Sequence, residues 1–133
     1  MDYRIVDSLE EMKVEDIARL LKMTYWADKR SMETIEKAVR NSSCYGVYAE
    51  GAEQLVGFAR VISDYATSYY LCDVIVDPAY RGRGLGKALV SHIVSRPEYT
   101  GLRGLLITQH AHDLYRKYGF EVVNDSFMAR APR

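Results

Sequence analysis

The sequence predicts an α/β protein built on one mixed β-sheet, and three observations lead to this prediction. Apolar residues switch along the chain between strand and helix periodicity. Some neighbouring strand patterns are separated by short turns and others by helical patterns. A glycine-rich loop, residues 81–87, separates a strand pattern from a helix pattern. Because hairpins join antiparallel strands and helical crossovers join parallel ones, the sheet should contain both kinds of pairing.

The N-terminal half contains three expected strands and two expected helices. A short strand is expected at residues 3–6, followed by an amphipathic helix at 14–24, where apolar residues recur at helical spacing. A second helix should begin after Ser31, whose hydroxyl can cap it. Strands are expected at 44–49 and 55–62, with a glycine in the turn between them.

The C-terminal half is expected to continue the sheet. A strand at 69–76 leads into the glycine loop and a helix, and a short buried strand follows at 105–108. A helix at 111–118 precedes a glycine that suits its C-terminal end. The last expected element is a hairpin of strands 121–123 and 127–131, turning at an Asn-Asp pair.

Composition limits the classes of function. The chain has 133 residues, which corresponds to a single domain over residues 1–133. Eighteen basic and 18 acidic residues give a net charge of zero, which argues against nucleic-acid and membrane partners. No membrane-spanning stretch or signal peptide is evident, so a cytoplasmic protein is expected. The two cysteines lack metal-ligand spacing, and no metal is expected.

The glycine loop predicts an anion site, because glycines let backbone N–H groups converge and the following helix adds the positive end of its dipole. Two familiar phosphate loops do not fit. A Walker A loop needs glycine where this chain has Arg81, and Ser or Thr where it has Ala88. In a dinucleotide fingerprint the third glycine would follow one residue later than Gly86.

A third pattern fits in full. Arg81-x-x-Gly84-x-Gly86 resembles the acyl-CoA loop of the GCN5-related N-acetyltransferase (GNAT) family. A second signature of that family follows in the expected order, and here its matching residues are Ala111, Leu114, Tyr115, Gly119 and Phe120. Together the two signatures span residues 69–123 and resemble a small, single-domain bacterial member of the family.

The resemblance implies a GNAT fold, in which two central parallel strands of a mixed sheet splay apart in a V and about four helices flank the sheet. In this chain the splayed strands would be 69–76 and 105–108. Acetyl-CoA would be the co-substrate, with its pantetheine lying in the splay like an added strand. The residues implied in coenzyme binding are Val74, Ile75, Val76, Arg81, Gly82, Arg83, Gly84, Leu85, Gly86, Lys87, Thr108, Ala111, Leu114 and Tyr115. Thr108 stands where relatives often carry asparagine.

Two residues are predicted to be catalytic. Tyr115 lies where many family members place a tyrosine near the thiol sulfur, and a phenol there can protonate the departing thiolate. Asp73, on the splayed strand, could take a proton from the amine or anchor it. Asp64 and His110 remain alternatives for the base.

The acceptor pocket is expected to include Tyr25, Trp26, Asp64 and Tyr69. Mixed charge at this entrance favours a small zwitterionic amine as acceptor. The implied function is therefore N-acetyl transfer from acetyl-CoA to a primary amine of a small molecule, by direct attack in a ternary complex. The alternatives are a catalytically weak acyl-CoA-binding or sensing module, or a transferase for another acyl group. A homodimer is an option by fold-level analogy alone.

Overall fold

The computed structural model describes residues 2–132 and contains a mixed five-stranded sheet in the order β1-β2-β3-β4-β5. The strands are β1 (Tyr3–Val6), β2 (Ser43–Ala49), β3 (Gly57–Ser63), β4 (Ser68–Val76) and β5 (Arg103–Leu105). The first four pair antiparallel in sequence order, and β5 pairs parallel to β4. The prediction of a mixed α/β sheet is therefore confirmed.

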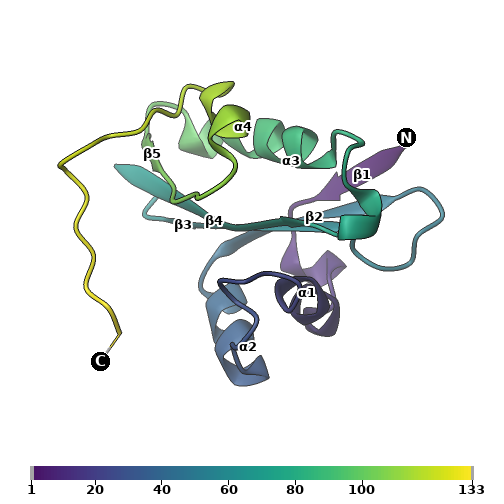
Figure 1. The fold of residues 1–133 in the computed structure, drawn as a ribbon. Coiled ribbons are helices and arrows are strands. Elements are labelled where there is room, and N and C mark those ends of the chain that lie inside the picture. The colour runs from purple at the N-terminus through teal and green to yellow at the C-terminus, as the bar shows by residue number, and fades with distance from the viewer. Residues whose placement is uncertain (1, 133) are drawn as a thin grey trace.

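Two layers of helices cover the sheet (Figure 1). The helices α1 (Val14–Leu21) and α2 (Met32–Arg40) lie on one face, and α3 (Leu85–Val94) and α4 (His112–Arg116) lie on the other. Short 3-10 turns are η1 (Leu9–Glu11), η2 (Pro78–Tyr80) and η3 (Pro97–Tyr99). No helix within residues 2–132 is long and apolar enough to cross a membrane.

Each face of the sheet has its own apolar core. On the α3 side, Leu85, Leu89 and Ile93 of the helix pack against sheet residues such as Val47. On the α1 side, the cluster includes Ile17, Leu20, Ile35, Phe58 and Ile75. Alternate residues of β2 and β3 contribute to opposite clusters, as the two-residue period of a strand requires.

The strand β4 changes its alternation at Asp73. The register with β3 shifts between Phe58, which pairs with Ile75, and Arg60, which pairs with Cys72. Asp73 adopts φ = 55°, a left-handed conformation that is uncommon for residues other than glycine. This β-bulge bends the strand and re-aims the side chains that follow it.

The last parallel strand is shorter and earlier than expected. It covers Arg103–Leu105 rather than 105–108, and its pairing with β4 ends where Tyr70 meets Leu105. The apolar run that suggested a buried strand is not buried, because Leu105 and Ile107 are both exposed. Beyond this point no pairing between β4 and the chain after β5 is found in the part of the chain that the structure describes, which is compatible with a V-shaped splay.

The expected C-terminal hairpin is absent from the described residues. Residues 121–132 contain only a turn at Asn124–Asp125, and all of them are exposed. In Figure 1 this segment leads away from the sheet. The prediction was wrong because alternating apolar residues form a strand only when a neighbouring strand accepts their backbone hydrogen bonds, and none lies beside this segment.

Candidate active site

The glycine loop leads directly into α3. Gly82 and Gly84 have φ of 78° and 80°, and Gly84 is the N-cap residue of the helix. The first helical bond runs from the Ala88 N–H to the Gly84 carbonyl, at 3.0 Å. The N–H groups of residues 85–87 therefore have no carbonyl partner within the helix, as at any helix start. With the helix dipole, they form a site suited to an anionic group such as pyrophosphate.

The loop leaves room for such a ligand. A Cβ atom added at Gly82 or Gly84 would meet no atom within 4 Å, so the glycines are needed for their positive φ rather than for internal space. Gly86 faces Val76, and a Cβ there would lie 3.6 Å from that side chain. The residues present fit the phosphate-binding role that the sequence resemblance implied.

The arginines of the loop contact protein groups nearby. The Nε of Arg81 donates to the Val76 carbonyl at 3.3 Å and so ties the loop to the end of β4. The guanidinium carbon of Arg83 lies 5.4 Å from the centroid of the Tyr80 ring, within cation–π range. A role of Arg81 and Arg83 in holding phosphate remains a prediction.

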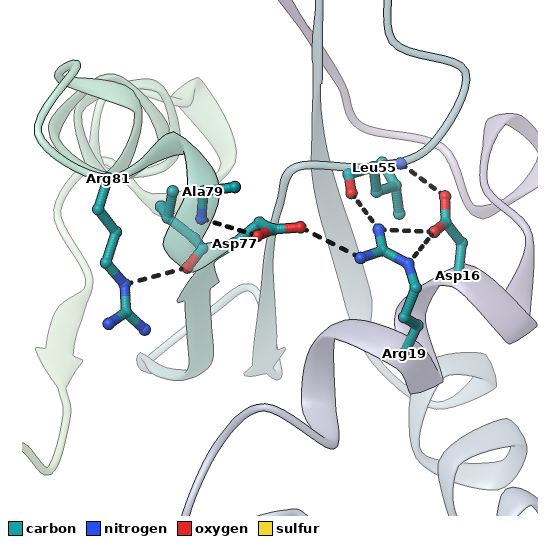
Figure 2. A network of polar contacts seen from close by, with 7 residues as sticks. Asp16, Arg19, Leu55, Asp77, Ala79 and Arg81 are labelled. Carbon is teal, nitrogen blue, oxygen red and sulfur yellow. Dashed lines mark hydrogen bonds and ion pairs between the residues drawn. The ribbon is translucent and has the colours of Figure 1, made fainter.

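A polar network that the sequence analysis missed joins α1 to the turn before this loop (Figure 2). Asp77 accepts the Ala79 N–H at 2.9 Å with one oxygen and the Arg19 guanidinium at 3.2 Å with the other. Arg19 also donates to the Leu55 carbonyl at 2.6 Å and to Asp16 at 2.9 Å. The i, i+3 spacing of Asp16 and Arg19 was the available signal in the sequence.

The helix α4 contributes Tyr115 to the apolar core on the α3 side. The Thr108 hydroxyl accepts the Ala111 N–H at 3.0 Å, which fixes the start of the helix, so Thr108 has a structural task at the position where coenzyme contact was expected. The Tyr118 hydroxyl donates to the Lys87 carbonyl at 3.0 Å and links α4 to α3.

The Tyr115 side chain is buried, and its ring meets Phe120 edge to face at 6.1 Å. Burial raises the pKa of Tyr115 to about 12, so the phenol keeps its proton at neutral pH. Among the contacts of residues 2–132, none involves the Tyr115 hydroxyl as a hydrogen-bond partner. The hydroxyl has no protein partner, but the raised pKa makes it a weaker acid, so the role of Tyr115 as general acid remains a prediction.

Asp73 is the centre of a second polar cluster. One oxygen accepts the Trp26 Nε1–H at 3.2 Å, and the other accepts from Arg30 at 2.7 Å and Arg60 at 2.9 Å. Its side chain is 2% exposed. Burial alone would raise the pKa of Asp73, but the hydrogen bonds and charges of the two arginines outweigh it and lower the pKa below its usual value.

This geometry argues against Asp73 as the general base. A carboxylate with a lowered pKa and donors on both oxygens is a weak proton acceptor. Its arrangement fits instead a positioning residue that holds Trp26, Arg30 and Arg60 around the bulge of β4. The sequence analysis named Asp73 and Trp26 and counted Arg30 in the mixed charge of the acceptor entrance. It missed Arg60, although this residue stands out as a cation within an otherwise apolar strand.

The loop after α1 brings two predicted acceptor residues beside this cluster. Tyr25 and Trp26 meet edge to face at 5.1 Å, and the Tyr25 ring lies 6.4 Å from that of His110. Both aromatic side chains are largely exposed. The buried Thr24 hydroxyl fixes the loop by donating to Leu21 and accepting the Ala27 N–H. Tyr25, Trp26, Asp73 and His110 therefore form one neighbourhood.

Asp64 and Tyr69 do not join that neighbourhood. Asp64 lies in the exposed turn between β3 and β4, where it accepts the N–H groups of Ala66 and Thr67, and these hydrogen bonds lower its pKa. Tyr69 is buried on the α3 side and packs on Tyr99 at 4.9 Å. The expectation that these two residues line the acceptor pocket was therefore wrong, because one caps a turn and the other fills the core.

The fold and site define an α/β domain with a mixed sheet and an anion site where a glycine loop opens a helix. A family model described as an acetyltransferase (GNAT) domain matches residues 40–122. The chain belongs to the GNAT family, and the resemblance found in the sequence is confirmed.

Individual proteins similar to this chain are consistent with the family assignment. A GNAT-family protein from Xanthomonas campestris has a crystal structure that aligns with a TM-score of 0.91 at 38% identity, over 99% of this chain and 94% of that one. Histone acetyltransferase TAP1 of Glycine max is 33% identical over 129 residues, which cover 88% of this chain and 55% of that protein. A chloroplastic GCN5-related N-acetyltransferase 2 of Arabidopsis thaliana is 41% identical over 71 residues, 52% of this chain and 28% of that one. The chain thus spans about half the length, or less, of these two plant relatives.

Proposed function

We propose that the chain transfers an acetyl group from acetyl-CoA to the primary amine of a small molecule, by direct attack in a ternary complex. The observation that carries this proposal is the anion site at the start of α3, where Gly84 caps the helix and the N–H groups of residues 85–87 have no helical partner. Membership of the GNAT family supports acetyl transfer as the class of reaction. Acetyl-CoA supplies the thioester whose acetyl group moves.

Each part of the proposed reaction is assigned to particular residues of this chain. The N–H groups at the start of α3 hold the pyrophosphate, and the open edge of β4 from Leu71 to Val76 pairs with the amides of pantetheine. The acceptor first loses a proton to solvent, which His110, beside Tyr25, would carry, and the neutral amine nitrogen then attacks the thioester carbon. As the C–S bond breaks, Tyr115 gives its proton to the thiolate, and the nitrogen loses its second proton, which through solvent restores the Tyr115 phenol.

Charge on the acceptor side favours an amine that also bears a carboxylate. Arg30 and Arg60 share the single negative charge of Asp73, which leaves the cluster with one excess positive charge. Only one nitrogen of Arg30 is bound to Asp73, and more than a quarter of its side chain is exposed. A guanidinium with free donors recognises carboxylates well, and the rings of Tyr25 and Trp26 suit an apolar part of the acceptor.

Release of free thiol from acetyl-CoA with a panel of amines tests this proposal. Turnover of amino acids or other amines with a carboxylate is expected, and spermine should be a poor substrate. Turnover of histone-tail peptides alone would instead point to the activity named for the soybean relative. Tight coenzyme A binding with no thiol release for any amine or acyl chain length would favour a binding or sensing module.

Replacing Arg30 by methionine refines the test. The variant keeps the aliphatic stem and loses the charge, so KM for carboxylate-bearing acceptors should rise at least tenfold while KM for acetyl-CoA stays unchanged. Lys29→Met, which removes the neighbouring charge, is the matched control and should leave both constants within about twofold. Equal KM values for acceptors with and without a carboxylate in wild type would contradict the acceptor class.

A further inference from the structure

Three apolar side chains, called the apolar row from here on, lie side by side across one end of the sheet. Ile62 on β3 pairs with Tyr70 on β4, and Tyr70 pairs in turn with Leu105 on β5. Residues that pair directly point to the same face of a sheet. Because the neighbouring Val61 and Leu71 belong to the core on the α3 side, the apolar row faces the α1 side.

The helices on that side leave the apolar row partly open. Ile62 is 45% exposed and Leu105 is 47% exposed, although both lie within strands. Tyr70, between them, is half-buried. In Figure 1 this end of β3, β4 and β5 extends past α2. An apolar strip left open on a face that helices otherwise cover indicates a surface that binds another molecule.

The apolar row lies beside the cluster of Asp73. Arg60 and Cys72 form the next pair along β3 and β4 on the same face, and a step of two residues along a strand is roughly 7 Å. Burial raises the pKa of Tyr70, and Asp73, Arg60 and Arg30 are near enough for their charges to act on it. A cluster with excess positive charge and an apolar strip are therefore continuous on one surface.

We propose that the apolar row binds the side chain of the acceptor, and that the acceptor is an amine with a carboxylate and a large apolar side chain. This proposal rests on the proposed function, because it takes the carboxylate to bind at Arg30. Charge complementarity selects the occupant, since the positive cluster attracts the carboxylate end of such a molecule. A charged side chain would lose hydration on the apolar row without gaining a partner.

The width of the apolar row sets the size of the side chain. Neighbouring strands lie about 4.8 Å apart, so a row across three strands is roughly 10 Å wide. A phenyl ring or a branched aliphatic group fits within this width, and a ring also gains from packing on Tyr70. One methylene in an enclosed enzyme pocket changes kcat/KM by about tenfold or more, so a whole ring on this half-open surface should give at least that much.

Alanine and phenylalanine as acceptors in the thiol-release assay provide the test, because they differ only in the ring. In wild type, kcat/KM should be at least tenfold higher for phenylalanine. The double substitution Ile62→Ser with Leu105→Ser removes apolar contact at two half-exposed positions, so this ratio should fall at least fivefold while KM for acetyl-CoA stays unchanged. Tyr3→Ser, at a similarly exposed position of the opposite edge strand β1, is the matched control and should keep the ratio. Equal kcat/KM for the two amino acids in wild type, or a ratio that survives the double substitution, overturns the proposal.

Calorimetric titration distinguishes a failure of this proposal from a failure of the proposed function. Phenylalanine should bind the protein saturated with coenzyme A at least tenfold more tightly than alanine, and the double variant should lose this difference. If the difference is found but no amine releases thiol, the apolar row stands and the proposed acetyl transfer fails. If phenylalanine and alanine bind alike while other amines are acetylated, the transfer stands and the apolar row is overturned. Phenethylamine lacks the carboxylate, and binding as tight as that of phenylalanine would overturn the carboxylate part of the proposal.

Discussion

The two faces of β4 hold the two halves of the candidate site by different means. On the α3 side the site is mostly backbone: positive-φ glycines, the N–H groups of a helix start and an unpaired strand edge. On the α1 side it is made of side chains, with Trp26, Arg30 and Arg60 gathered on Asp73. A backbone device depends on local geometry, whereas a side-chain cluster depends on residues far apart in sequence. The predictions below separate the two kinds of construction.

The largest effect is expected for Tyr115→Phe. The ring and its packing remain, but the proton is lost, so kcat should fall by roughly 10²–10⁴ with little change in coenzyme A affinity. Tyr118→Phe removes a hydroxyl from the same helix and should cost less than tenfold in kcat. Steady-state kinetics of both variants provide the measurement, and an equal loss in the two would mean that Tyr115 acts only through packing.

Tyr115→Phe should also change how the free energy of unfolding depends on pH. Because the folded pKa of Tyr115, about 12, lies above its unfolded value near 10, the unfolded chain releases this proton first as the pH rises. Wild type should therefore lose up to roughly 3 kcal/mol of unfolding free energy between pH 10 and 12 that Tyr115→Phe retains. Urea unfolding at pH 8 and pH 11.5 compares the two proteins.

Asp73→Asn should cause the next largest effect, and mainly in stability. Asparagine tolerates the left-handed φ but leaves Arg60 without its anionic partner, so the free energy of unfolding should fall by about 3–5 kcal/mol. The folded pKa of Asp73 is lowered, so its contribution is present above the unfolded value near 3.9 and disappears as the pH falls through the folded pKa.

Denaturant unfolding of wild type and Asp73→Asn at pH 7 and pH 3 measures both the loss of unfolding free energy and its dependence on pH. The matched control is Asp64→Asn, because Asp64 also has a lowered pKa but is exposed in a turn. The free energy of unfolding should fall much less in Asp64→Asn than in Asp73→Asn. If Asp73→Asn were as stable as wild type but lost turnover while binding both substrates, a direct proton-accepting role would return to consideration.

Gly84→Val tests the backbone half of the site. A β-branched residue at φ = 80° is strained and blocks close approach to the helix start, so the dissociation constant of coenzyme A should rise at least tenfold. Gly101→Val imposes the same strain, since Gly101 has φ = 81° and equally open surroundings after α3. Calorimetric titration should find unchanged affinity in Gly101→Val, and a similar loss in both variants would assign the effect to stability alone.

The smallest effect is expected for Arg19→Met, which cuts the link between α1 and the turn before the glycine loop. The substitution removes the Arg19 contacts with Asp77, Asp16 and the Leu55 carbonyl, and through the lost Asp77 contact it should raise KM for acetyl-CoA about three- to tenfold and leave kcat within twofold. Arg4→Met, which removes an exposed arginine paired with Glu11, is the control. An unchanged KM in Arg19→Met would show that the loop keeps its shape without α1.

The contrast between backbone and side-chain construction also explains which parts of the fold and site the sequence predicts. The glycine loop, the start of α3 and the position of Tyr115 are local in sequence, and their patterns indicated them in advance. The partners of Asp73 lie 13, 43 and 47 residues away, so no local pattern could report that its oxygens are already occupied. Tyr69 was misassigned for a related reason, since its burial depends on contact with Tyr99 from a distant turn.

The bulge at Asp73 has a consequence for engineering. It turns the Asp73 side chain toward Trp26, Arg30 and Arg60 on the α1 side, while Val74 and Val76 pack on the α3 side. A library that randomises Tyr25 while preserving Trp26, Arg30 and residues 74–87 would vary the proposed acceptor side and keep the hydrogen bonds of the buried Asp73. Selection from such a library should yield enzymes with new acceptors and the parental affinity for acetyl-CoA.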